Sequence, residues 1–274
     1  MNQDMIDRWN GPEADHWVDN ADRYDGQFEP FLHALNNAVG PDPLGDVLDI
    51  GCGCGELTMT LATRATSATG VDISSRLLNI AELRAVERGI PNVGFVTADA
   101  QNWEPSSIFD LIVSRFGVMF FDDPAAAFTN LHRMLAPEGR IVFACWQGLG
   151  EQPWLLEAGA AAAPHLSPGP PPVAGPGMFA LADRTTIHTL LAGAGFSNVE
   201  IQDHHTPMYI GGPGSVADAT HFFAGTGIAR TMLDGATPEA AALAIHAVTA
   251  VMTTHHDGVG VNVDTATWIV TATS

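Results

Sequence analysis

Short apolar runs alternate with amphipathic stretches through the first half of the chain. The runs cover residues 47–50, 68–71, 93–96, 109–113 and 140–146, and most of them are bounded by glycine, proline or acidic residues. Residues 56–64, 74–88 and 125–135 are predicted to form helices. Strands that alternate with helices are typical of a parallel sheet covered by helices on both faces. We expect residues 41–146 to form such a Rossmann-like core.

The first 40 residues predict helices with an aromatic stripe. Trp9, Trp17, Tyr24 and Phe28 recur at helical spacing, and Gly11-Pro12 interrupts the pattern. A stripe of this kind usually packs on the domain that follows it. The alternative is a helical lid over a bound cofactor, to which Trp17 and Tyr24 would contribute.

The pattern becomes irregular after residue 146. Proline and glycine crowd residues 147–182, which predicts a cap insertion with one short helix at 154–163. Residues 183–274 then return to the core, with a helix at 184–192, a strand at 199–210 and a last strand at 265–273. A second insertion at about 211–256 contains helices at 216–223 and 238–253. The predicted fold is an α/β, Rossmann-like sheet of seven mostly parallel strands, with an antiparallel last strand and helical caps.

Composition narrows the possible partners. The chain has 274 residues, 46% of them hydrophobic and 15% charged, and a formal charge of −20. All eleven basic residues are arginine. A surface this acidic is unsuited to nucleic acid or to an anionic membrane. We expect a small-molecule partner, and the sequence leaves both a monomer and a homodimer open.

The three cysteines and the termini indicate the compartment. Cys52 and Cys54 lie inside a glycine turn and Cys145 lies in the strand run at 140–146, so no zinc-ligand spacing is present. The N-terminal stretch is polar, unlike a signal peptide, and no apolar run approaches the ~20 residues that span a membrane. A cytoplasmic protein with reduced thiols is expected.

The stretch at 46–61 combines an apolar strand, a glycine turn and a helix start. Gly51, Gly53 and Gly55 follow Asp49 at alternate positions. Glycine allows tight turns and a close approach of a ligand to the backbone. The spacing is G-x-G-x-G, not the G-x-G-x-x-G of dinucleotide sites, and the lysine of a phosphate loop is missing. A nicotinamide-dependent reductase is disfavoured for the same reasons.

Acidic residues follow the next two strands. Asp72 comes 21 residues after Gly51, where a carboxylate can accept hydrogen bonds from two ribose hydroxyls. It could instead cap the helix at 74–88. Asp99 could accept from an adenine amino group, or be a solvated loop acid. A metal site could be suggested at the paired carboxylates of Asp122 and Asp123. We favour a helix that Asp123 caps and that begins at Pro124, so no metal is predicted.

Ordered motifs resemble those of class I S-adenosylmethionine (SAM) dependent methyltransferases. They are D-I-G-C-G-C-G at 49–55, V-D-I-S at 71–74, A-D-A at 98–100, F-D-L-I-V-S-R-F-G-V-M-F-F at 109–121 and L-A-P-E-G-R-I-V-F at 135–143. The later C-W and P-W pairs, F-A-L-A-D at 179–183 and G-F-S-N-V at 195–199 resemble a bacterial subgroup near the UbiE/menG-like small-molecule methyltransferases. The similarity covers nearly the whole chain and is most specific through Trp146.

The resemblance implies SAM as the cofactor and S-adenosylhomocysteine as its product. The cofactor-binding residues it implies, with the lid aromatics, are Trp17, Tyr24, Asp49, Gly51, Cys52, Gly53, Gly55, Asp72, Ile73, Asp99, Ala100, Ser114, Arg115 and Phe116. Asp49 and the glycines would hold the methionine end, and Ser114 to Phe116 would lie beside the sulfonium. Arg115 could hold a substrate anion or pair with a neighbouring acid.

Methyl transfer from a sulfonium is an in-line displacement, for which alignment of the reactants is the main requirement. An oxygen, nitrogen or carbon of a small, largely apolar acceptor, such as an aromatic natural product, would receive the methyl group. A base would assist an O–H or N–H acceptor. His204, His205 and His221 are candidates, although each is more often a structural or surface histidine. The alternative is a SAM-binding protein of this fold that catalyses a rearrangement or cyclisation, or that only binds.

Overall fold

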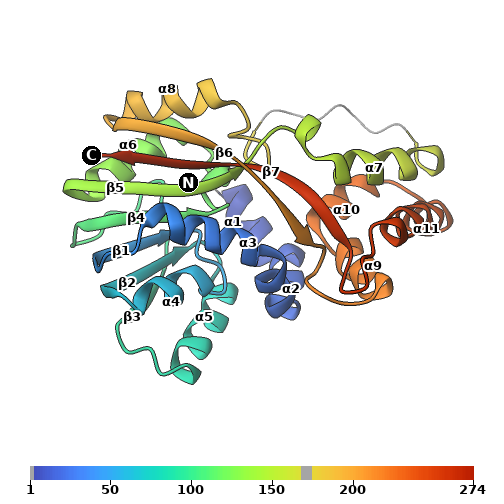
Figure 1. Ribbon diagram of the computed structural model, residues 1–274, viewed down its shortest axis with the longest axis horizontal. Coiled ribbons are helices and arrows are strands. Elements are labelled where there is room, and N and C mark those ends of the chain that lie inside the picture. The colour runs from blue at the N-terminus through green and yellow to red at the C-terminus, as the bar shows by residue number, and fades with distance from the viewer. Residues whose placement is uncertain (1–2, 168–174) are drawn as a thin grey trace.

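A seven-stranded sheet forms the centre of the computed structural model, which describes residues 3–167 and 175–274 (Figure 1). The strands are β1 (Leu44–Ile50), β2 (Ala65–Asp72), β3 (Val93–Thr97), β4 (Phe109–Arg115), β5 (Leu135–Trp146), β6 (Ser197–Tyr209) and β7 (Asn262–Thr273). Their order across the sheet is β3-β2-β1-β4-β5-β7-β6. The predicted Rossmann-like sheet is confirmed.

One strand of the sheet, β7, runs against the direction of the other six. β1 pairs in parallel with β2 and β4, and the parallel pattern extends to β3 and β5. β7 lies between β5 and β6 and runs antiparallel to both. The reversal of chain order about β1 and β4 opens a crevice at the carboxyl ends of these strands, which is where open α/β sheets bind ligands.

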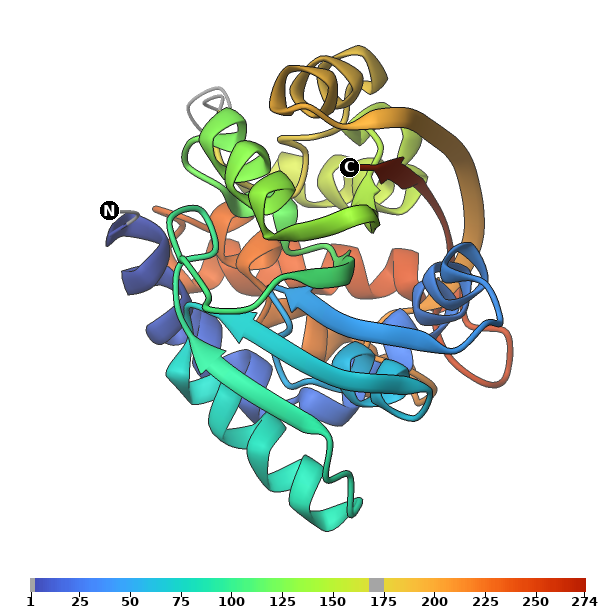
Figure 2. The ribbon, with the colours of Figure 1, turned by 90° about the vertical axis from the view of Figure 1, so that its left-hand side faces the viewer.

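Helices cover both faces of the sheet. They are α3 (Ala21–Val39), α4 (Glu56–Ala62), α5 (Ser75–Glu87), α6 (Pro124–Met134) and α8 (Arg184–Ala194). The apolar sides of the strands are buried beneath them, including Val47, Leu48, Ile112 and Val142. Figure 2 shows the twist of the strands and the flanking helices from the side. The twist is the right-handed one expected of strands built from L-residues.

The helix starts follow the predicted capping chemistry. Asp123 accepts a hydrogen bond from the Ala126 N–H at 3.0 Å, with Pro124 at the first helical position. Asp183 caps α8 in the same way, through the Thr185 N–H at 2.8 Å. The cap of α5 is Ser74 rather than Asp72, which leaves the Asp72 carboxylate available for other contacts.

Two insertions form a helical cap beyond the strand ends. They contain α7 (Pro153–Ala162), α9 (Val216–Ala224), α10 (Gly227–Met232) and α11 (Pro238–Thr254), which group together on one side in Figure 1. The sequence predicted three of these and missed the six-residue α10. Pro168, Pro170, Pro171 and Pro172 of the proline-rich stretch lie outside the described residues.

The N-terminal segment packs between the core and the cap. It consists of α1 (Gln3–Asn10), α2 (Pro12–Asp19) and α3, with the break at Gly11 that the sequence predicts. Arg84 of α5 joins this segment to the core through Asp22 and Asp25 at 2.5 and 2.8 Å. The Nδ2 of Asn10 donates to the Ile73 carbonyl at 3.1 Å. The segment therefore covers the loop after β2. Among the helices described, none is long and apolar enough to cross a membrane.

Candidate active site

The glycine turn after β1 is folded against the end of β4. Gly51 has a φ of +65°, and a Cβ built on it would lie 2.7 Å from the Gly117 Cα. Gly117 has the reciprocal restriction, because its own Cβ would lie 2.5 Å from the Ile50 carbonyl oxygen. Ser114 holds this junction by donating to the Ile50 carbonyl at 2.7 Å and accepting from the Gly117 N–H at 3.1 Å. The glycines therefore bring two strand ends together and leave the backbone open to a ligand.

Asp72 connects the glycine turn to the end of β2. One carboxylate oxygen accepts from the Gly53 N–H at 2.9 Å, and the other accepts from the Ser74 N–H at 2.8 Å. Burial raises the pKa of Asp72, and the backbone N–H groups oppose that rise. The carboxylate is thus fixed in direction and lines the main chamber of the site, with Ile73 beside it.

Asp99 and Ala100 follow β3 and line the same chamber. One Asp99 oxygen accepts from the Gln101 N–H at 3.0 Å. The other oxygen is buried, and no described residue donates to it. A buried acceptor without a donor is costly, so this oxygen fits a ligand that carries an N–H or O–H group.

Asp49 and Arg115 line a smaller cavity behind the glycine turn, about 450 Å³ in volume. The Thr58 hydroxyl donates to one Asp49 oxygen at 2.6 Å, and the other oxygen has no donor among the described residues. One terminal nitrogen of Arg115 lies 3.8 Å from Asp25, and the other is buried without an acceptor there. An unpaired carboxylate oxygen and an unpaired guanidinium nitrogen suit the ammonium and carboxylate of an amino acid.

Burial controls the ionisation of both groups. It raises the pKa of Asp49 to about 7, and the Thr58 hydroxyl and the Arg115 charge oppose the rise. Burial also lowers the pKa of Arg115, against the attraction of Asp25 and Asp49. The cavity therefore holds charges that lack full solvation, a state that a zwitterionic ligand would relieve.

The main chamber lies between the core, the N-terminal helices and the cap. Its volume is about 1420 Å³ with its open mouth included. Most of the wall away from the glycine turn is apolar. These wall residues are Phe28, Phe116, Met119, Trp146, Trp154, Met178, Met208, Ile210, Phe222 and Phe223. The chamber thus combines polar groups at the strand ends with an apolar wall, which suits a cofactor beside a second, largely apolar molecule.

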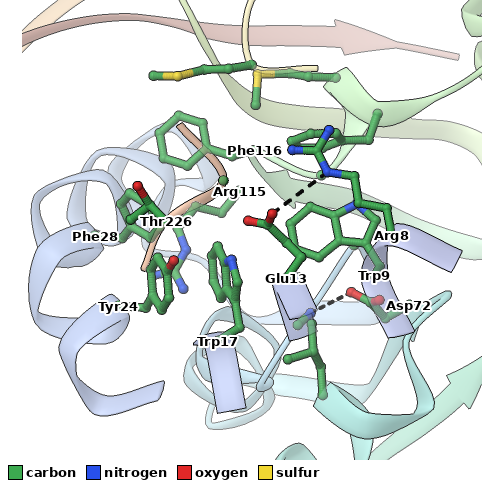
Figure 3. A pocket seen from close by; sticks show the side chains of 18 of the residues that line it. Arg8, Trp9, Glu13, Trp17, Tyr24, Phe28, Asp72, Arg115, Phe116 and Thr226 are labelled. Atoms are coloured by element: carbon green, nitrogen blue, oxygen red, sulfur yellow. Dashed lines mark hydrogen bonds and ion pairs between the residues drawn. The ribbon is translucent and has the colours of Figure 1, made fainter. Parts of the chain in front are cut away.

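Two aromatic rings stand where the two cavities meet. Trp17 and Tyr24 stack with ring centres 3.6 Å apart and line both the chamber and the smaller cavity. Figure 3 shows the pair beside Phe28 and across from Asp72. A ring face attracts a cation, so this junction is suited to a positively charged sulfonium.

The structure brings the predicted cofactor residues together but not the histidines. Of the fourteen sequence-predicted positions, Cys52 and Asp49 line the smaller cavity, Gly55 closes the turn against Ala81 and Phe95, and Ser114 is buried behind the turn. The other ten line the chamber.

His204, His205 and His221 are absent from the described lining of that chamber. His205 is exposed beside Asp203 at 2.9 Å. His204 lies 6.4 Å from the Phe31 ring, and burial lowers its pKa. Their role as bases has no support from geometry.

The sequence prediction missed several polar residues of the chamber. Arg8 and Glu13 enter from α1 and α2, and Gln27 enters from α3. Glu13 pairs with Arg230 of the unpredicted α10 at 2.5 Å. No sequence motif marks a contact between residues 217 positions apart. The one signal in the sequence was a glutamate spaced four residues from Trp9 and from Trp17, on an otherwise aromatic stripe.

In the part of the chain that the structure describes, no group of three histidine, cysteine, aspartate or glutamate side chains is placed to hold a metal ion. The three cysteines are buried and unpaired with one another.

Comparison with known proteins agrees with this geometry. Residues 47–139 match the family described as a methyltransferase domain. The ubiquinone biosynthesis O-methyltransferase of Paracidovorax citrulli is 29% identical over 139 residues, which are 47% of this chain and 56% of that protein. The aklanonic acid methyltransferase DauC of a Streptomyces species is 34% identical over 120 residues, or 42% and 54% of the two chains. The chain thus spans about half the length of these curated relatives.

Solved structures support the fold over a longer span. The YcgJ protein from Bacillus subtilis has a TM-score of 0.59 and 16% identity, over 89% of this chain and 97% of that one. At this identity the likeness concerns the fold alone. The sheet, the glycine turn and the family match define residues 47–139 as a class I SAM-dependent methyltransferase domain. The two curated relatives are bacterial proteins named as methyltransferases, and SAM is the cofactor of the class.

Proposed function

We propose that the protein transfers the methyl group of SAM to a small, largely apolar acceptor. The observation that carries this proposal is the meeting of two cavities at the Trp17–Tyr24 stack. One is small and charged and the other is large and apolar. A sulfonium at the junction would present its methyl group to a molecule in the apolar chamber.

The unpaired polar atoms match the cofactor. The Asp49 oxygen and the Arg115 nitrogen without partners would receive the ammonium and carboxylate of the methionine part. Asp72 would accept from the ribose hydroxyls, and the free Asp99 oxygen would accept from the adenine amino group. This assigns Arg115 to the cofactor, with Asp25 as its structural partner.

The protein would contribute mainly by positioning. An in-line displacement needs the acceptor atom, the methyl carbon and the sulfur in one line, and such alignment is worth about 7–11 kcal/mol. Phe116 and Trp146 stack with ring centres 4.6 Å apart and give the chamber a flat wall. A flat wall of this kind suits an aromatic or polycyclic acceptor. The relatives named for ubiquinone and aklanonic acid biosynthesis support an acceptor of this class.

Two measurements test the proposal. Calorimetry with SAM and S-adenosylhomocysteine should detect binding of both, and methyl-labelled SAM should transfer label to flat apolar acceptors. SAM binding without label transfer to any acceptor would favour the alternative, a rearrangement or cyclisation on the same fold. Absence of binding by both cofactor forms would refute the proposal.

A further inference from the structure

Three carboxylates line the chamber among the residues described: Glu13, Asp72 and Asp99. Asp72 already accepts two backbone N–H groups beside the glycine turn, and Asp99 lies at the end of β3. The proposed function assigns both to the cofactor. Glu13 comes from α2 and not from the end of a strand. It is the carboxylate available to the acceptor.

The Glu13 carboxylate lies in a built site. Its side chain is 11% exposed, and its Oε2 accepts from Arg230 at 2.5 Å, with the Arg8 Nε 3.9 Å away. A Cβ at Gly227 would lie 2.5 Å from Oε2 and 2.9 Å from Oε1, so the cap provides a notch that glycine alone leaves open. No described residue forms a hydrogen bond with Oε1. One oxygen is therefore anchored, and the other is available at the chamber, where Figure 3 shows the carboxylate beneath Arg8.

Two hydrogen-bond donors of α3 line the same chamber. Tyr24 and Gln27 are three residues apart and so share one side of the helix. Burial, and then the Glu13 charge, raise the pKa of Tyr24, so its hydroxyl stays protonated. The Gln27 Oε1 accepts from the Gly211 N–H at 2.8 Å, which leaves the amide N–H groups as donors without a described acceptor. Both side chains therefore offer donors that suit a ligand oxygen.

We propose that the acceptor carries an acidic hydroxyl, a phenol or an enol, next to a carbonyl oxygen. Glu13 is the catalytic residue that receives the hydroxyl proton, and Tyr24 and Gln27 donate to the carbonyl. This inference rests on the proposed function and specifies its acceptor class.

The reaction step balances without any further reactant. The acceptor oxygen forms a bond to the methyl carbon, and the carbon–sulfur bond breaks with its electron pair left on sulfur. The sulfonium becomes a neutral thioether, and the hydroxyl proton passes to Glu13. A carboxylate is too weak a base for an ammonium or an aliphatic alcohol. It is suited to a phenol or enol acidified by a neighbouring carbonyl.

The charged and titratable groups around Glu13 come from three neighbouring helices and its own. They are Arg8 of α1, Tyr24 of α3, Arg230 of α10 and His16 of α2. The two guanidinium groups stay charged through the neutral range, since arginine does not lose its proton in proteins. Burial lowers the pKa of His16, which favours its neutral form. Two guanidinium groups and one neutral imidazole therefore surround the Glu13 carboxylate.

The test uses the full chain with labelled SAM and two probes of equal shape, 1-hydroxyanthraquinone and 1-aminoanthraquinone. The wild-type protein should label the hydroxyl probe and not the amine. Glu13→Gln should lower kcat for the hydroxyl probe at least ~100-fold at pH 7 with an unchanged Kd for SAM. Its rate should then rise about tenfold per pH unit as the probe ionises in solution, whereas the wild-type profile stays flat. Asp19→Asn, the same chemical change at an exposed site on α2, should behave as the wild type.

Arg230→Gln separates the catalytic role of Glu13 from its structural role in joining α2 to α10 of the cap. It breaks the ion pair but keeps the carboxylate, so it should lower the rate by a similar factor at every pH. Equal losses in Glu13→Gln and Arg230→Gln across the pH range would overturn the inference, as would label on the amine alone. A wild-type protein that binds SAM but labels neither probe would overturn the acceptor class and leave the cofactor assignment intact. Failure to bind SAM would instead refute the proposed function.

Discussion

The Thr58 hydroxyl donates to one oxygen of Asp49 at 2.6 Å and leaves the other oxygen buried without a donor. The carboxyl group is therefore half satisfied, and burial raises its pKa to about 7. A group in this state binds a proton or a cation more readily than an exposed carboxylate does. Two predictions concern this position.

The first concerns stability in the absence of ligand. The pKa of Asp49 is higher in the folded protein, about 7, than its ordinary value of 3.8. Between those values the folded state holds more protons, so the free energy of unfolding should fall as the pH rises from 4 to 7. Asp49→Asn should remove this part of the slope. Urea denaturation of both proteins at several pH values measures it, and identical slopes would contradict the prediction.

The second prediction concerns affinity for SAM. The ionised Asp49 carboxylate would attract the ammonium of the methionine part, which keeps its proton up to about pH 7.7. Affinity should therefore increase as the pH rises toward 7, and Asp49→Asn should flatten that increase. Isothermal calorimetry between pH 5.5 and 7.5 is the measurement. An equally steep increase in the variant would rule out Asp49 as its source.

Asp72 should be needed for cofactor binding. Its two oxygens are directed by the N–H groups of Gly53 and Ser74. Asp72→Ala should weaken SAM binding at least tenfold, about 1.4 kcal/mol, because the ribose hydroxyls lose their acceptor. The exposed Asp122 provides the control, since Asp122→Ala should leave the calorimetric Kd unchanged. Unchanged affinity in Asp72→Ala would remove it from the site.

Two glycines of the turn should differ on substitution. Gly51 and Gly53 have φ values of +65° and +54°, so alanine is strained at both. Only at Gly51 does an added Cβ collide, 2.7 Å from the Gly117 Cα, whereas no atom lies within 4 Å at Gly53. Gly51→Ala should therefore lower the melting temperature more than Gly53→Ala, by several degrees. Equal melting temperatures would show that backbone strain, and not the collision with Gly117, causes the loss of stability.

The cysteines of the turn should react slowly. Burial raises the pKa of Cys54 to about 12 and raises that of Cys52 well above its usual value. Thiolate is the reactive form, so alkylation by iodoacetamide at pH 8 should be slow in the folded protein. Mass spectrometry before and after addition of urea would measure the difference. Rapid modification of native protein would contradict the burial of these thiols.

Most of the core could be predicted because its signals are local. Apolar runs identify the strands, and Asp123, Asp183 and Gly195 mark helix ends through their own side chains or backbone. The start of β5 could not be predicted in this way. Glu138 has a φ of +64°, and β5 continues past it to Leu135 through a shift of register with β4. That continuation depends on a neighbouring strand.

Some residues of the candidate site could likewise be predicted from local sequence, whereas others are positioned by distant parts of the chain. Asp49, Asp72 and the glycine turn follow strands in a known order, so the sequence indicates where they meet. Glu13 takes its position from Arg230 and Gly227, more than two hundred residues away. Closeness to the cap in sequence does not by itself place a side chain at the chamber, and none of the three candidate histidines is among the described residues that line it.

The position of β7 between β5 and β6 has a consequence for synthesis on the ribosome. β6 has no partner in the sheet other than β7, so residues 197–209 cannot join the sheet before residues 262–273 are made. Until then β5 presents an unpaired apolar edge, which is a template for association with other chains. A nascent chain stalled after α11 should therefore depend on chaperones more than the finished one.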